Sequence, residues 1–211
     1  RGWTRLKSLV EELMVRKAEG IGNTAPLTGV EVGVSRGWTS EHLLQAFPTL
    51  HLTMVDVWET MRASDVYIGS GDSHARLKAE EQQEHRWAAE QRTTFAKDRR
   101  TVLVMDSVQA AERIANASLD FAFIDSDHTY DGVLRDLEAW WPKLRIGGLI
   151  AGHDWQHPRD KRGLWGVSKA WREFCWGLGS DVRNTGIFET GEAESTIVWI
   201  HKTRERIEML A

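Results

Sequence analysis

The densest group of titratable side chains is the segment Asp125-Ser126-Asp127-His128, which directly follows the apolar run Phe121–Ile124. Carboxylates held this close together need a cation or a shared proton between them. The imidazole of His128 is the side chain whose ordinary pKa suits proton transfer near neutral pH. The segment therefore predicts general acid–base chemistry, with His128 as the candidate base. Taken singly, each residue could instead cap a helix or form a surface ion pair.

A second pair, His153 and Asp154, follows the next apolar run, at residues 147–152. The carboxyl ends of adjacent parallel strands meet at one edge of a sheet, so we expect this pair to lie beside Asp125. Oxygen and imidazole ligands in such a group suit Mg²⁺, Mn²⁺ or a similar divalent ion. We predict a metal site formed by Asp125, His153 and Asp154, with His128 beside it as the general base.

A glycine-containing turn, Glu31-Val32-Gly33-Val34-Ser35-Arg36-Gly37, follows the first apolar strand. Gly33 permits a sharp turn and removes a side chain where a ligand must approach, and Gly37 does the same at the entrance of the next helix. The spacing differs from the dinucleotide fingerprint G-x-G-x-x-G, which argues against an NAD-type oxidoreductase. A tight turn that binds no ligand is the alternative for this motif alone.

Two further polar sites lie at the ends of the following strands. Asp56 ends the second strand, where a carboxylate can accept both hydroxyl groups of a ribose. Asp106 and Ser107 end the third strand, where a short polar pair could contact an adenine ring. Capping of the next helix is an equally good interpretation of that pair. Together with the glycine turn, these residues favour an adenosine-bearing ligand.

The elements that must position these side chains alternate between strand and helix. Strands are expected at residues 28–32, 50–57, 101–105, 119–124 and 147–152, and a closing hairpin at 182–189 and 196–201. Helices are expected at residues 3–18, 75–96, 108–115, 130–144 and 165–176, and another after a cap at Thr39 or Ser40. Such alternation implies βαβ units, hence a parallel sheet covered on both faces. We predict a three-layer Rossmann-like α/β sandwich with a mostly parallel, seven-stranded sheet and a C-terminal antiparallel hairpin.

Residues 60–100 form a longer connection than an ordinary α/β unit needs. We therefore predict one domain over residues 1–211, with an N-terminal helix and a helical insertion at this place. The insertion is either a lid over the site or a solvated packing helix. The N-terminal helix, at residues 3–18, either forms a homodimer interface or covers the sheet.

Composition limits the classes of partner. The 211 residues carry a net charge of −4 and contain no dense basic cluster, so nucleic acid is not expected. No apolar run approaches the ~20 residues of a membrane helix, so no membrane partner is expected. Cys175 is the only cysteine, which excludes a disulfide framework and fits a cytoplasmic protein. The sequence begins at Arg1 rather than Met, which leaves room for a preceding N-terminal segment.

In this order, the motifs resemble the class I S-adenosylmethionine-dependent methyltransferases. The likeness is greatest to the branch that contains the metal-dependent sugar O-methyltransferases of macrolide biosynthesis and the cephalosporin-hydroxylase-like proteins. It covers roughly residues 28–175, and its most specific part runs from Leu119 to Asp154. The resemblance implies S-adenosylmethionine as cofactor and O-methylation of a small hydroxylated molecule, assisted by a divalent metal. A metal-independent N- or C-methyltransferase and a catalytically silent cofactor-binding protein are the alternatives.

The resemblance also implies a role for each matching residue. The residues expected at the cofactor are Glu31, Gly33, Ser35, Gly37, Ser40, Asp56, Asp106, Ser107 and Asp125. Asp125 and Asp154 would hold the metal, and His128 or Asp127 would take the proton from the acceptor. Relatives with a metal site carry an acidic residue where this chain has His153. Because imidazole is a poor ligand for Mg²⁺, the choice of metal stays open, and His153 is a second candidate base.

Overall fold

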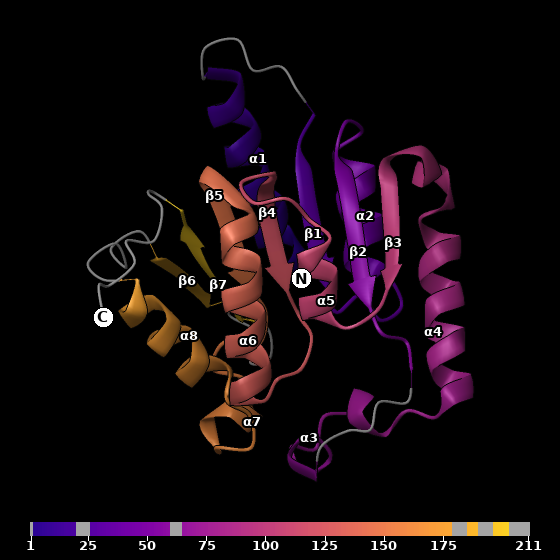
Figure 1. The fold of residues 1–211 in the computed structure, drawn as a ribbon, viewed down its shortest axis with the longest axis vertical. Coiled ribbons are helices and arrows are strands. Elements are labelled where there is room, and N and C mark those ends of the chain that lie inside the picture. Colours follow the sequence, from indigo (N-terminus) through magenta and orange to yellow (C-terminus); the bar gives the residue numbers. More distant parts are fainter. Residues whose placement is uncertain (1, 20–25, 60–64, 179–184, 190–195, 203–211) are drawn as a thin grey trace.

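A seven-stranded sheet with helices on both faces forms the centre of the molecule (Figure 1). The computed structural model describes residues 2–19, 26–59, 65–178, 185–189 and 196–202. The strand order is β3-β2-β1-β4-β5-β7-β6. Every neighbouring pair is parallel except the two that involve β7, which is antiparallel to both β5 and β6. The predicted three-layer α/β fold and its antiparallel C-terminal hairpin are confirmed.

The bounds of the elements follow the prediction closely in the sheet. The strands are β1 Thr28–Val32, β2 His51–Asp56, β3 Arg100–Val104, β4 Leu119–Ile124, β5 Leu144–Gly152, β6 Thr185–Glu189 and β7 Thr196–His201. The α-helices are α1 Gly2–Glu19, α2 Trp38–Ala46, α3 Asp65–Gly69, α4 Ala79–Arg92, α5 Ser107–Glu112, α6 Tyr130–Trp140, α7 Pro158–Lys161 and α8 Val167–Gly177. Short 3₁₀ helices are η1 His74–Arg76, η2 Thr94–Arg99 and η3 Trp141–Lys143. Residues 182–184 of the expected hairpin lie outside the described residues.

Two apolar cores lie on opposite faces of the sheet. Helices α5, α6 and α8, in front in Figure 1, cover one face, where Leu137 and Trp171 are buried against Ile150. Helices α1 and α2 cover the other face, where Leu6 and Phe121 belong to one buried cluster. Every residue of β4 is buried, and all are apolar except Asp120, whose carboxylate forms ion pairs with Lys17 and Arg145. Helix α1 therefore covers the sheet, which was one of the two roles expected for it. A homodimer stays a prediction.

Several predicted helix ends are wrong, for local reasons. Helix α2 begins at Trp38 behind Gly37, whose φ of 77° makes it the cap in place of Thr39 or Ser40. The helix expected over 130–144 ends at Trp140, because residues 141–143 tighten into a 3₁₀ turn that contains a proline. Leu144 already belongs to β5, which is therefore longer than expected. The helix expected over 75–96 is shorter, with α4 ending at Arg92 before a separate 3₁₀ segment.

The register of the parallel strands sets the level of the functional residues. Val32 is paired with Val55 and with Ile124, and Ile124 is paired with Gly152. The residues that follow this level lie at one edge of the sheet: Gly33, Asp56, Asp125 and His153. Helices α3 and α7 lie below the same carboxyl ends in Figure 1. Among the described helices, none has the length and apolar character needed to cross a membrane.

Candidate active site

A pocket of about 1030 Å³ opens at the carboxyl ends of β1, β2, β4 and β5. Most of the residues expected from the sequence to form a site line it: Glu31, Gly33, Ser35, Asp56, Asp106, Ser107, Asp125, Asp127, His128, His153 and Asp154. Gly37 and Ser40 do not line it. The sheet edge therefore brings together the two motifs on which the sequence prediction rests.

The glycine turn is held in place by the strands on either side of it. Gly33 has a φ of 87°, and a Cβ atom there would lie 2.0 Å from the carbonyl oxygen of Asp125. The carboxylate of Asp56 accepts hydrogen bonds from the backbone N–H groups of Val34, at 2.9 Å, and Ser35, at 2.8 Å. It also accepts one from Trp58 N–H at 3.0 Å. Gly33 is thus required by close packing as well as by its conformation. The carboxylate of Asp56 uses much of its hydrogen-bonding capacity to hold the turn, and its contact with a ribose stays a prediction.

Glu31, Gly37 and Ser40 support the turn from behind. A Cβ atom on Gly37 would lie 2.7 Å from the Cα atom of Ala89, so this glycine allows α4 to approach α2. Ser40 donates a hydrogen bond to the carboxylate of Glu31, which is only 2% exposed. Burial raises the pKa of Glu31 to about 8, and the nearby carboxylates add to the effect. Glu31 thus prefers its neutral form unless a positive charge lies close to it.

Asp106 and Ser107 have roles in the fold as well as in the pocket wall. The carboxylate of Asp106 accepts from Val108 N–H at 2.9 Å and caps α5. The hydroxyl of Ser107 accepts a hydrogen bond from Trp140 Nε1 at 2.9 Å. The structure therefore shows the capping role, and an adenine contact stays a prediction.

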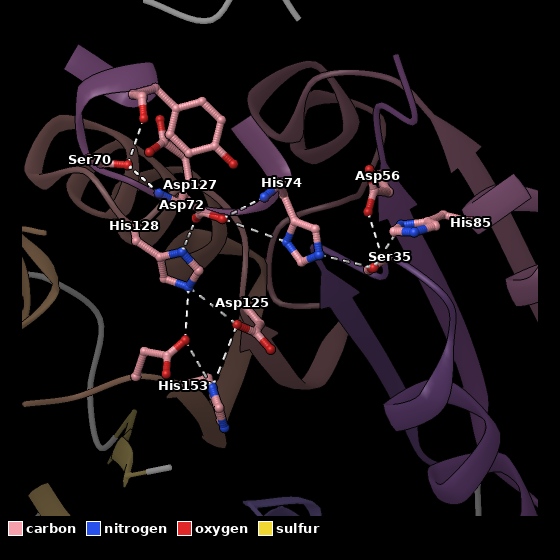
Figure 2. Close-up of polar contacts among 12 residues, drawn as sticks. Ser35, Asp56, Ser70, Asp72, His74, His85, Asp125, Asp127, His128 and His153 are labelled. Atoms are coloured by element: carbon pink, nitrogen blue, oxygen red, sulfur yellow. Dashed lines mark hydrogen bonds and ion pairs between the residues drawn. The ribbon is translucent and has the colours of Figure 1, made fainter. Parts of the chain in front are cut away.

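His128 lies at the centre of a buried cluster of carboxylates (Figure 2). Its Nδ1 atom lies 2.5 Å from Asp72 Oδ2, and because a carboxylate only accepts, Nδ1 donates that hydrogen bond. Its Nε2 atom faces Asp154 Oδ2 at 3.0 Å and Asp125 Oδ1 at 3.5 Å. Burial alone would lower the pKa of His128, but the three carboxylates outweigh it and raise the pKa well above its ordinary value.

His153 and Asp154 complete the cluster at the end of β5. His153 Nδ1 lies 3.1 Å from Asp154 Oδ2 and 3.8 Å from Asp125 Oδ1. Burial opposes the charge on His153, yet the neighbouring carboxylates raise its pKa to about 9. Burial likewise opposes the charge on Asp154, and the two histidines nevertheless hold its pKa below the usual range. The cluster carries an excess of negative charge that protonated histidines compensate.

The donor atoms of the cluster fit a divalent metal. One ligand atom each from Asp125, His128 and Asp154 lie within 4.8 Å of one another. His128 Nε2 is buried and, although close to two carboxylates, makes no hydrogen bond of good geometry. A buried nitrogen and two carboxylate oxygens together offer a divalent ion mixed nitrogen and oxygen ligands. This grouping differs from the predicted set, since His128 takes the place expected for His153, whose role as a ligand stays a prediction.

A family model described as a methyltransferase domain matches residues 30–155, which include the glycine turn and both halves of the cluster. The chain belongs to this methyltransferase family. No sequence among the curated proteins matches the chain.

Solved structures share the fold of this methyltransferase at low sequence identity. An N-methyltransferase, NodS, from Bradyrhizobium japonicum is 14% identical, with a TM-score of 0.56 over 95% of this chain and 96% of that one. An rRNA methylase from Streptococcus thermophilus is 11% identical, with a TM-score of 0.55 over 85% of this chain and 89% of that one. Spermidine synthase from Thermotoga maritima is 13% identical, with a TM-score of 0.54 over 90% of this chain and 59% of that one. At such identities the likeness establishes the fold alone.

The pocket of the methyltransferase has lining residues that the sequence did not indicate. Asp72, in the insertion, is 2% exposed and 56 positions away from His128, its hydrogen-bond partner. His74 and His85, also from the insertion, lie 3.4 Å and 3.2 Å from the hydroxyl of Ser35. Figure 2 shows these contacts joining the glycine turn to the carboxylate cluster. The insertion is therefore part of the site, which favours the lid over the solvated packing helix.

Asp127, the alternative proton acceptor, has a different position in the methyltransferase. Its carboxylate accepts a hydrogen bond from Thr129 N–H at 2.8 Å. A Cβ atom on Gly132 would lie 2.5 Å from the same carboxylate, so the first turn of α6 packs closely on it. Asp127 thus supports the start of α6, and the geometry favours His128 as the group that handles a proton.

Proposed function

We propose that this methyltransferase uses S-adenosylmethionine to methylate a hydroxyl group of a small molecule, with a divalent metal at Asp125 and Asp154. The observation that carries the proposal is the double position of Asp125. Its backbone lies against Gly33 of the glycine turn, and its carboxylate belongs to the cluster around His128. A cofactor over the turn and an acceptor at the cluster would therefore meet at one residue. This arrangement also supports the branch of metal-dependent sugar O-methyltransferases.

The residues around the turn fit a positively charged cofactor. The sulfonium and the amino group of S-adenosylmethionine are both cationic, and an adjacent cation favours the ionised form of a buried carboxyl group. Glu31 is such a group, buried behind the turn with its pKa raised to about 8. Ser35, in the turn itself, would contact the cofactor directly, whereas Gly37 and Ser40 would act through the shape of the turn.

Replacing Glu31 by glutamine should separate cofactor binding from stability. The raised pKa means that the folded chain keeps a proton that the unfolded chain loses between pH 4.5 and about 8. This stabilising contribution is complete below pH 4.5 and is lost as the pH rises through about 8. We expect Glu31→Gln to raise the free energy of unfolding of the cofactor-free protein at pH 8 by at least ~1 kcal/mol. The same variant should bind S-adenosylhomocysteine at least ~10-fold more weakly.

Denaturant titrations at pH 4.5 and pH 8, with calorimetry of S-adenosylhomocysteine, test this expectation. Glu80→Gln, at an exposed position of α4, is the matched control. A variant that is no more stable than the wild type at pH 8, or that binds S-adenosylhomocysteine equally well, would contradict the assigned role of Glu31.

When bound, S-adenosylmethionine supplies an electrophilic methyl group, whose transfer forms a methyl ether from the hydroxyl, releases S-adenosylhomocysteine and frees one proton. His128 accepts that proton at Nε2, while Asp72 holds Nδ1–H and so fixes the tautomer that leaves Nε2 available. The stacking of Trp165 on the imidazole, with ring centroids 4.2 Å apart, restricts the orientation of His128 and excludes water from one of its faces. These contacts hold the proton acceptor in a single position.

The carboxylates of Asp125 and Asp154 would hold the metal, and Nε2 of His128, which lies within 4.8 Å of a ligand oxygen of each, would stay beside the ion as the proton acceptor. When bound, a divalent ion lowers the pKa of an acceptor hydroxyl. Positive charge at this place also disfavours the imidazolium form, so it lowers the raised pKa of His128. The imidazole is then neutral, as a proton acceptor must be.

A chelation experiment tests the metal. We expect EDTA to reduce formation of S-adenosylhomocysteine from a panel of hydroxylated acceptors by at least ~10-fold, and Mn²⁺ to restore it better than Mg²⁺, because the cluster includes imidazole. An enzyme that methylates nitrogen acceptors and ignores EDTA would contradict the proposal and support the metal-independent alternative. Asp125→Asn should make the residual activity insensitive to added metal, whereas Glu80→Gln should respond as the wild type does.

A further inference from the structure

Two arginines line the pocket near Trp165, which stacks on His128. Arg159 belongs to α7 and Arg162 follows it, and both line the pocket together with His157 and Trp165. Nothing in the proposed cofactor site or metal site uses them. They lie instead where an acceptor would extend away from the reacting hydroxyl group.

Neither arginine has its charge neutralised by a contact. Within the described part of the chain, neither guanidinium group takes part in an ion pair or a hydrogen bond. The adjacent acid, Asp160, accepts hydrogen bonds from Ser168 N–H at 3.2 and 3.3 Å. Arg135, by contrast, lines the same pocket but pairs with Asp106 at 3.3 Å. The two positive charges on the segment after β5 are thus available to a ligand.

The segment that carries these arginines packs against His128. Trp165 is stacked between His128 and His157, with ring centroids 4.2 and 4.4 Å apart. Gly166 N–H donates to the carbonyl oxygen of His128 at 2.9 Å. The guanidinium carbon of Arg159 lies 5.5 Å from the centroid of the Trp165 ring. The segment is therefore held against the proton acceptor, and Arg159 lies beside it, with Arg162 three residues further along the same pocket wall.

The charges around Arg159 and Arg162 indicate which kind of ligand group these arginines would bind. A divalent ion at the cluster would neutralise the carboxylates of Asp125 and Asp154, so these could not also balance Arg159 and Arg162. Guanidinium groups bind carboxylates and phosphates through paired, planar hydrogen bonds. We propose that the methyl acceptor is an anion, whose carboxylate or phosphate group lies against Arg159 and Arg162 while its hydroxyl group reaches His128. This inference rests on the proposed function, because it assumes that the acceptor lies at His128.

Paired probes that differ only in charge test the inference. Binding of glucose, glucuronate and glucose 6-phosphate, and of 3,4-dihydroxybenzyl alcohol and 3,4-dihydroxybenzoate, is measured by calorimetry on protein saturated with S-adenosylhomocysteine and Mn²⁺. We expect an anionic member to bind at least ~10-fold more tightly than its neutral partner. The carboxylate and phosphate arms show which group the site prefers. The double variant Arg159→Gln, Arg162→Gln should lose the preference, whereas Lys161→Gln, exposed on the same helix and outside the pocket, should keep it.

Equal binding of neutral and anionic partners, no binding of any anionic probe, or equal weakening of both partners in the double variant would overturn the inference. Titration of S-adenosylhomocysteine into the same variants distinguishes this failure from that of the proposed function. If S-adenosylhomocysteine binds and the charge preference is missing, only the anionic acceptor is wrong. If S-adenosylhomocysteine itself does not bind to the wild type, the proposed function fails with it.

Discussion

Replacing His128 by alanine is expected to lower the turnover of methyl transfer by at least ~100-fold, the usual weight of a general base. The residue is 8% exposed, its Nδ1 atom is held by Asp72, and its Nε2 atom faces the carboxylates of Asp125 and Asp154. Its contacts are with these three carboxylates and with Trp165, so S-adenosylhomocysteine at the glycine turn should bind the variant within ~3-fold of the wild type. Turnover falls in this variant because it lacks the imidazole that would accept the proton.

The experiment measures turnover and calorimetric binding on the same preparations. His51→Ala, at an exposed position at the start of β2, is the matched control and should leave both quantities unchanged. Wild-type turnover in His128→Ala would remove His128 from the mechanism. Loss of both turnover and S-adenosylhomocysteine binding would instead show that His128 serves the structure of the pocket.

Replacing Gly33 by alanine should have the largest effect on stability. Alanine at a φ of 87° is strained, and its Cβ atom would lie 2.0 Å from the carbonyl oxygen of Asp125. That oxygen belongs to the backbone and cannot rotate away, so the ends of β1 and β4 must separate. We expect the free energy of unfolding to fall by about 3 kcal/mol or more, from strain and overpacking together. S-adenosylhomocysteine binding should fall as well, since the turn would move.

Gly147 provides a matched control for this experiment. It has a φ of 85°, close to that of Gly33, but a Cβ atom there would meet nothing within 4 Å. Gly147→Ala should therefore cost only the conformational strain, roughly 1–2 kcal/mol. Denaturant titration of both variants isolates the contribution of the close contact. Equal losses of stability would contradict the packing of the turn against Asp125.

The sheet could be predicted from the sequence because its strands carry a pattern that the packing enforces. Residues 119–124 are apolar except for Asp120, and β4 occupies these positions because both of its faces are buried. Helix ends were less predictable, since they depend on single contacts. The apolar spacing of α6 continues to Leu144, yet the helix stops at Trp140 before the turn that contains Pro142.

The site could be predicted only for residues that the strand order alone brings close together. Asp125 and Asp154 end adjacent parallel strands, so their meeting follows from the strand order. Asp72 comes from an insertion without a helical or strand pattern at that point, and no spacing rule connects it with His128. The choice between His128 and His153 as the imidazole nearest to both carboxylates depends on side-chain orientation, which the order of residues does not determine.

Anomalous diffraction at the manganese edge, on crystals grown with Mn²⁺ and S-adenosylhomocysteine, tests the central claim most directly. The account predicts a manganese peak between the carboxylates of Asp125 and Asp154, within reach of His128 Nε2, and S-adenosylhomocysteine over the turn at Gly33. Well-ordered S-adenosylhomocysteine at the turn with no manganese at these carboxylates would contradict the metal-assisted mechanism. S-adenosylhomocysteine bound elsewhere would contradict the cofactor site itself.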